Sequence, residues 1–152
     1  MQFHRRKALK RLIAAAGTIG VALGVWKSRA TRAAEWPRDA YGASTVADAL
    51  RNLYGTGETT ASHAVKVRAP TRVQSGGVVP VSVSADLPDV RAISILIEKN
   101  SPPLAAHVHL SGAVAFFAIN VRMASTSDVR VVVNAGGQLY APKRNVEVLV
   151  GA

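Results

Sequence analysis

The chain has 152 residues, of which 49 % are apolar and 18 % charged, so it has room for one small domain with a hydrophobic core. Eight of its 19 Lys and Arg residues lie within residues 1–34, which contain no acidic residue. This leaves 11 basic and 9 acidic groups among the other 118 residues, a net charge of +2. The distribution excludes a dense basic surface for nucleic acid. The absence of cysteine excludes disulfides, thiolate metal sites and thiol nucleophiles.

Residues 1–34 have the organisation of a signal peptide. A basic segment from Arg5 to Arg11 precedes the uncharged, apolar stretch Leu12–Trp26, and alanines follow near the end. Fifteen helical residues span about 22 Å, less than the roughly 30 Å hydrocarbon core of a bilayer. We therefore predict an exported protein whose signal peptide is cleaved after Ala33 or Ala34. An uncleaved N-terminal membrane anchor is the alternative.

The basic segment also indicates the export route. Arg5 and Arg6, followed by Lys7, resemble the twin-arginine (Tat) signature, with Ala8 where phenylalanine is usual. This motif predicts a bacterial periplasmic protein. The mature domain would then comprise residues 35–152.

One short helix is predicted near the start of this domain. Ser44 is the expected N-cap, and Gly55 the residue that ends the helix. Val46, Leu50 and Leu53 would form one apolar face. A helix of about eleven residues is marginal alone, so this face should pack against a larger element.

From Ala64 onward, apolar residues alternate with polar ones, as in β-strands with one buried face. The alternating positions are Val65 and Val67; Val79, Val81 and Val83; Ile93, Ile95 and Ile97; Phe117, Ile119, Val121 and Met123; Val129, Val131 and Val133; and Val146, Val148 and Val150. Glycine-, proline- and asparagine-rich turns separate these runs. The pattern predicts an all-β fold, a β-sandwich of antiparallel strands. Pro80 should lie near a strand start or on an edge, because proline cannot donate to a ladder hydrogen bond.

Few residues are candidates for a chemical site. His107 and His109 are two apart on an expected strand, so their rings should share one face and could hold a metal, with Glu98 or His63 as a third ligand. The alternative is a solvated strand face. No glycine-rich phosphate loop, nucleophile turn or paired carboxylates occur, so we expect no catalytic residue, no cofactor and no enzymatic activity.

The order of several motifs is similar to that of the SoxY family, the sulfur-carrying subunits of the periplasmic SoxYZ complex of thiosulfate oxidation. The matching segments are Trp36–Tyr41, Ala47–Gly55, Val78–Ser84, Leu87–Val90, Ile93–Asn100 with Pro102–Ala105, Arg122–Met123 with Ser125–Ser127, Gly137–Tyr140 and Val146–Val150. The resemblance implies an immunoglobulin-like β-sandwich, a heterodimer with a SoxZ-like subunit, and action together with the other Sox enzymes.

The sequence departs from the family at the residues that would carry sulfur. SoxY proteins end in a flexible Gly-Gly-Cys-Gly-Gly arm, whose thiolate is the nucleophile and whose glycines let it swing. Here Gly151 and Ala152 follow the last valine strand, and the carrier cysteine is expected just after Ala152. Either the sequence is cut short or the protein is a degenerate paralogue. An immunoglobulin-like metal-binding or structural module of the periplasm is the alternative function.

Overall fold

The computed structural model describes residues 36–74 and 77–149, so the predicted signal peptide and its Arg5–Arg6 pair lie outside the described residues. Strands dominate the described part of the chain, as predicted. Its elements are α2 (Arg38–Tyr41), α3 (Val46–Tyr54), β1 (Val65–Arg68), β2 (Arg72–Gln74), β3 (Val78–Ala85), β4 (Val90–Ile97), β5 (Leu104–His109), β6 (Phe116–Arg122), β7 (Ser127–Ala135), β8 (Gln138–Tyr140) and β9 (Lys143–Leu149).

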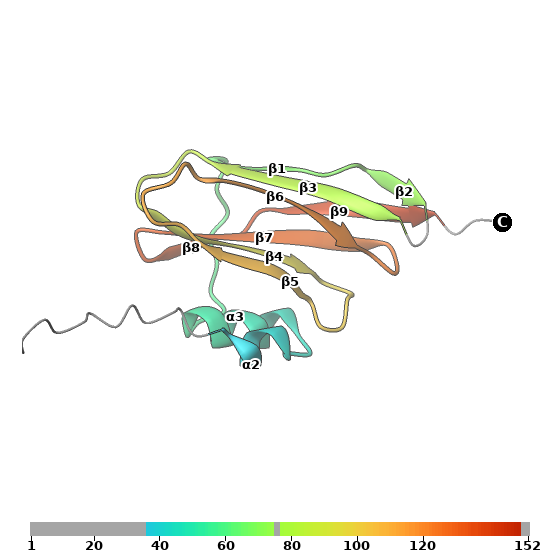
Figure 1. The fold of residues 1–152 in the computed structure, drawn as a ribbon, viewed down its shortest axis with the longest axis horizontal. Coiled ribbons are helices and arrows are strands. Elements are labelled where there is room, and N and C mark those ends of the chain that lie inside the picture. The colour runs from blue at the N-terminus through green and yellow to red at the C-terminus, as the bar shows by residue number, and fades with distance from the viewer. Residues whose placement is uncertain (1–35, 75–76, 150–152) are drawn as a thin grey trace, which may run out of the picture. The chain divides into compact units, whose positions relative to one another are not determined.

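The strands form two sheets that face each other (Figure 1). The smaller sheet has the order β1-β3-β6, and the larger has the order β2-β9-β7-β4-β5, with β8 paired to β7. All neighbouring strands are antiparallel except β2 and β9, which are parallel. The predicted β-sandwich is therefore confirmed.

The alternating residues of the two sheets meet in one hydrophobic core. Val81 of β3, Ile95 of β4 and Val131 of β7 are at most 1 % exposed and belong to the same buried cluster. Their neighbours two residues away on each strand share that face, because successive side chains of a strand alternate between its faces. The period-two pattern of the sequence thus identifies the face that each strand buries.

The larger sheet is buried on its other face as well. Every residue of β4 from Ala92 to Ile97 is buried. Leu96 and Val132 lie in a second apolar cluster with Leu50 of α3 and Ala40 of α2. The two helices therefore cover the outer face of the larger sheet (Figure 1), which confirms that the apolar helix face packs against a larger element. A strand covered on both faces is rich in apolar residues, and the buried stretch Ala92–Ile97 of β4 contains one polar residue, Ser94.

The helix boundaries differ slightly from the prediction. The N-cap of α3 is Thr45 rather than Ser44, because Thr45 has the extended backbone of a cap and its hydroxyl accepts a hydrogen bond of 3.1 Å from the N–H of Asp48. Gly55 ends α3 in the left-handed region, at φ 75°, as expected. The single turn α2 was not predicted. No helix among the described residues is long and apolar enough to cross a membrane.

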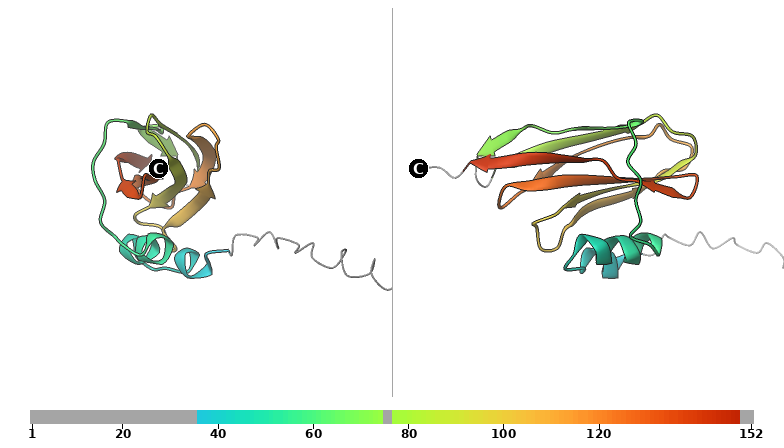
Figure 2. Two further views of the ribbon diagram at one scale, coloured as in Figure 1. Left: turned by 90° about the vertical axis from the view of Figure 1, so that its left-hand side faces the viewer. Right: turned by 180° about the vertical axis from the view of Figure 1, so that it is seen from behind.

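The chain between α3 and β1 passes along one side of the sandwich (Figure 2). Thr60 is attached there to the larger sheet, because its N–H donates to the carbonyl of Leu139 and its own carbonyl accepts from the N–H of Ala141, at 2.8 and 3.0 Å. This segment carries the chain from the helical layer to the smaller sheet.

Pro80 lies where the prediction placed it. It is the third residue of β3 and pairs with Asn120 of β6. On its other side, β1 pairs with β3 only from Ser82 onward, so Pro80 has no partner in β1. The missing N–H of proline therefore costs no ladder hydrogen bond.

Candidate functional site

The two predicted metal ligands lie side by side at the end of β5. The Nε2 atoms of His107 and His109 are 3.2 Å apart, and the two rings meet edge to face with centroids 4.6 Å apart. His109 is exposed, whereas His107 is partly buried. The structure thus brings the pair together on the face of the larger sheet that the helices cover.

The ring of His107 is held from behind by a buried serine. Ser94 lies directly opposite His107 in the β4–β5 ladder, is fully buried, and has its Oγ 2.8 Å from Nδ1 of His107. The hydroxyl of Tyr54, at the end of α3, lies 2.6 Å from the same Ser94 Oγ. Tyr54, Ser94 and His107 therefore form a continuous hydrogen-bonded chain from the helix to the strand.

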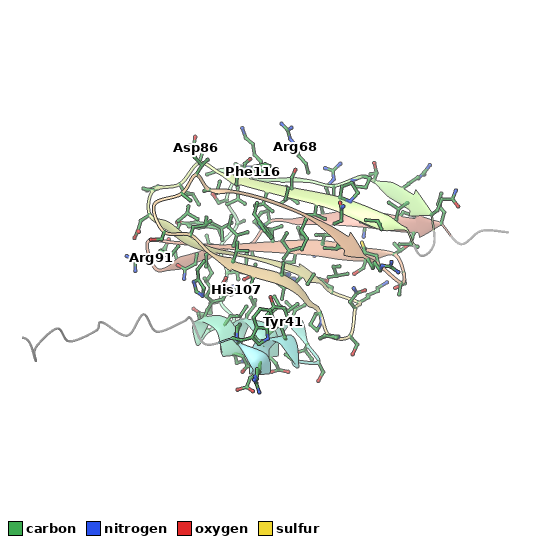
Figure 3. The ribbon with its side chains drawn as sticks, viewed as in Figure 1. Tyr41, Arg68, Asp86, Arg91, His107 and Phe116 are labelled. Atoms are coloured by element: carbon green, nitrogen blue, oxygen red, sulfur yellow. The ribbon has the colours of Figure 1, made fainter. Side chains whose placement is uncertain are left out.

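Helix α2 adds a second tie to the same strand. The N–H of His107 donates to the hydroxyl of Tyr41 at 3.1 Å. The ring of Tyr41 stacks on that of Trp36, with centroids 4.6 Å apart. Figure 3 shows Tyr41 and His107 on the helical side of the larger sheet, and Arg68 and Phe116 on the far side of the smaller sheet. The side chains that hold His107 come from three different elements, α2, α3 and β4.

Burial changes the proton affinity of this cluster. It lowers the pKa of His107 to about 4, with a further contribution from repulsion by His109. It raises the pKa of Tyr54 to about 12, although the hydrogen bond with Ser94 opposes the increase. His107 is therefore neutral at neutral pH and has one bare ring nitrogen.

This low pKa predicts a pH-dependent stability. Between the ordinary histidine pKa of 6.5 and about 4, the unfolded chain binds a proton at His107 that the folded protein does not bind. The stability that His107 contributes is therefore complete above pH 6.5 and is lost as the pH falls toward 4. We expect a loss of about 1–3 kcal/mol, since the partly exposed ring is screened by solvent.

The measurement is urea denaturation of the wild type and of His107→Gln at pH 7.5 and pH 4.5. The variant should lose less stability than the wild type between these two values, because glutamine does not titrate. His63→Gln, at an exposed histidine, is the matched control and should behave as the wild type. An identical pH dependence in His107→Gln and the wild type would contradict the assignment.

Neither of the predicted third ligands joins the pair. Glu98 forms an ion pair with Arg130, at 2.6 Å, and His63 lies exposed in the segment before β1. Among the described residues, no group of three or more His, Cys, Asp or Glu side chains is placed to hold a metal ion.

The strand that precedes the expected sulfur-carrying arm is held on both edges. Residues at the start of β9 pair with β7, and its last three residues pair with Arg72–Gln74 of β2. Val146 and Val148 are buried in the core, and the N–H of Val148 donates to Thr126 Oγ1 at 2.9 Å. The described chain therefore reaches Leu149 on a fixed strand.

Comparison with known proteins shows the family. The family described as "Sulfur oxidation protein SoxY" matches residues 50–152. The chain belongs to the SoxY family. Among solved structures, it is similar to the sulfur carrier protein SoxY from Chlorobium limicola f thiosulfatophilum, with 34 % identity over 67 % of this chain and 94 % of that chain, at a TM-score of 0.62. Among curated proteins, the comparison finds no match.

A more distant structural similarity concerns the fold alone. The superoxide reductase (neelaredoxin) from Ignicoccus hospitalis is 17 % identical, covers 57 % of this chain and 81 % of its own, and has a TM-score of 0.52. The SoxY domain therefore shares its sandwich with a protein of different chemistry, as is common among folds.

Proposed function

We propose that this SoxY-family chain is a periplasmic sulfur-carrier subunit of thiosulfate oxidation that works in a complex with a SoxZ-like subunit. The observation that carries the proposal is the family match over residues 50–152, together with the similarity to a sulfur carrier protein over 94 % of that protein's length. In this role the chain is not an enzyme. It presents bound sulfur to the partner enzymes that perform the chemistry.

The geometry of β9 is consistent with that role. A carrier needs a fixed domain and a mobile thiol, so that one group can visit several active sites. In SoxY proteins the thiol lies on an arm that follows the last valine strand. Here β7 pairs with that strand from Lys143 to Val146, and β2 pairs with it from Glu147 to Leu149. Since none of the 152 residues is a cysteine, sulfur carriage requires a thiol placed after this strand.

The proposal predicts a stable complex with SoxZ. Several large apolar side chains are exposed on the described surface, among them Phe116 at 57 % on the edge strand β6 and Val78 at 51 % on the central strand β3 of the smaller sheet. These two side chains lie at opposite ends of the β3–β6 ladder and do not form one apolar patch, so the expected complex follows from the family assignment. Co-expression with the cognate SoxZ should give a 1:1 heterodimer in size-exclusion chromatography with light scattering. Separate elution of the two proteins at micromolar concentration would argue against the assignment.

The proposed location predicts dependence on the Tat route. Replacing both Arg5 and Arg6 by lysine should leave the protein in the cytoplasm, because the twin arginine is the feature that distinguishes this signal. Cell fractionation and immunoblotting measure the distribution. A Lys7→Arg variant keeps the pair and serves as the control. Undiminished accumulation of the double-lysine variant in the periplasm would refute the Tat assignment.

A further inference from the structure

The histidine pair at the end of β5 has a geometry that the carrier role does not explain. Two histidines separated by one residue on a strand place both rings on one face. In this protein the two Nε2 atoms also approach each other to 3.2 Å. At this distance the Nε2–H of one ring must donate a hydrogen bond to Nε2 of the other. A single metal ion could take the place of that proton and bind both nitrogens.

The distance between the nitrogens matches the span of two ligands on one metal ion. Two imidazole nitrogens on a tetrahedral zinc ion lie about 3.3 Å apart. On a tetragonal copper ion, with an angle near 90°, they lie about 2.9 Å apart. The observed 3.2 Å falls between these values, so small rotations of the two rings would satisfy either geometry.

The groups behind His107 provide the outer support that metal-binding histidines need. A histidine that binds a metal through one nitrogen almost always donates the N–H of the other, which fixes the ring and its tautomer. Here Nδ1 of His107 is 2.8 Å from Ser94 Oγ, and Tyr54 in turn fixes Ser94. With the proton on Nδ1, the lone pair of Nε2 points toward His109.

The pair is also accessible, because His109 is exposed to solvent. We propose that His107 and His109 form a binding site for a divalent transition-metal ion, with Cu(II) bound more tightly than Zn(II). Imidazole suits both ions, and the general order of affinities places Cu(II) highest. With two protein ligands from the described chain, solvent fills the remaining coordination positions.

The site is tested by titrating the 152-residue protein with CuCl2 in the presence of glycine as a weak competitor. The protein has two other histidines, His4 and His63, and the double variant His4→Ala/His63→Ala keeps only the pair. This variant should bind one Cu(II) per chain, with an electron paramagnetic resonance spectrum that shows nitrogen ligands. Zn(II) should compete for the site.

Further replacement of His109 by alanine should weaken binding at least about tenfold, and Ser94→Ala should weaken it by about tenfold with the same stoichiometry. His109 is exposed, so its loss should leave the metal-free thermal unfolding temperature unchanged. The proposal is overturned if the double variant binds no Cu(II) against glycine. It is also overturned if the additional His109→Ala change leaves the affinity unaltered.

Discussion

Replacing Ile95 by alanine is expected to lower the free energy of unfolding by about 3–4 kcal/mol. Ile95 is fully buried on β4, which is flanked by β5 on one side and β7 on the other. Its side chain lies in the cluster that joins the two sheets. Removing three carbon atoms loses the free energy gained by burying them and leaves a cavity. The cavity cannot close easily, because β4 is hydrogen-bonded to a strand on each side. Small domains are stable by only about 5–15 kcal/mol, so the loss is a large share of the total.

Urea denaturation at neutral pH measures this effect, with two matched variants. Ile95→Val removes one carbon atom from the same site and should cost about 1 kcal/mol. Val114→Ala also removes apolar atoms, but Val114 is 85 % exposed, and the change should remain within about 0.5 kcal/mol. Equal losses for Ile95→Ala and Val114→Ala would show that the described core does not hold the two sheets together.

The strands of the sandwich core were predictable because each long strand carries a repeating signal. Alternation at Val79, Val81 and Val83 identifies both the strand and its buried face, since side chains along a strand point to opposite sides. Gly55 was predictable for a different reason, because the left-handed backbone that ends α3 favours glycine. In both cases the determining interactions are local in the sequence.

The elements that escaped prediction are short or depend on distant contacts. Helix α2 has four residues and β2 has three, too few for a period to show. The Tyr54–Ser94 hydrogen bond joins residues 40 positions apart, so no local pattern could indicate it. One signal was available in Ser94, a polar residue between two isoleucines in the apolar run of β4. A buried serine needs a hydrogen-bond partner, and in the structure Tyr54 and His107 provide it.

The expected proximity of His107 and His109 follows from strand geometry alone, whereas the positions of their neighbours do not. Glu98 follows the last residue of β4, whereas the histidine pair lies opposite Ala92–Ser94 of that strand, so the strand itself separates Glu98 from the pair. There Glu98 pairs with Arg130 of the neighbouring strand β7, because opposite charges on adjacent strands attract each other.

The sulfur chemistry has the largest expected effect. Joining thiosulfate to a thiol forms a sulfur–sulfur bond and releases one proton and two electrons, which the thiosulfate-oxidising partner enzymes must accept. Among protein side chains, cysteine is the one that forms such a bond reversibly. The 152-residue chain has none, and the thioether of Met123 cannot replace it, being both unreactive in this sense and buried. We therefore expect the 152-residue protein to take up no covalent sulfur.

Adding Cys-Gly-Gly after Ala152 should supply a thiol that can carry sulfur. The new thiol would follow β9, which the larger sheet holds as far as Leu149, as in the family's carrier arm. A Ser-Gly-Gly extension has the same length and flexibility and serves as the matched control. The serine-extended protein should take up no thiosulfate, because a hydroxyl cannot form a sulfur–sulfur bond.

The most direct test of the carrier assignment is intact-mass spectrometry of these three proteins, each purified with SoxZ and incubated with thiosulfate and the oxidising enzymes. The account predicts that the cysteine-extended protein gains one S2O3 group in place of one proton, while the 152-residue and serine-extended proteins keep their sequence masses. A covalent adduct on the 152-residue protein would contradict the chemistry, and failure of the cysteine-extended protein to load within an intact SoxZ complex would contradict the carrier function.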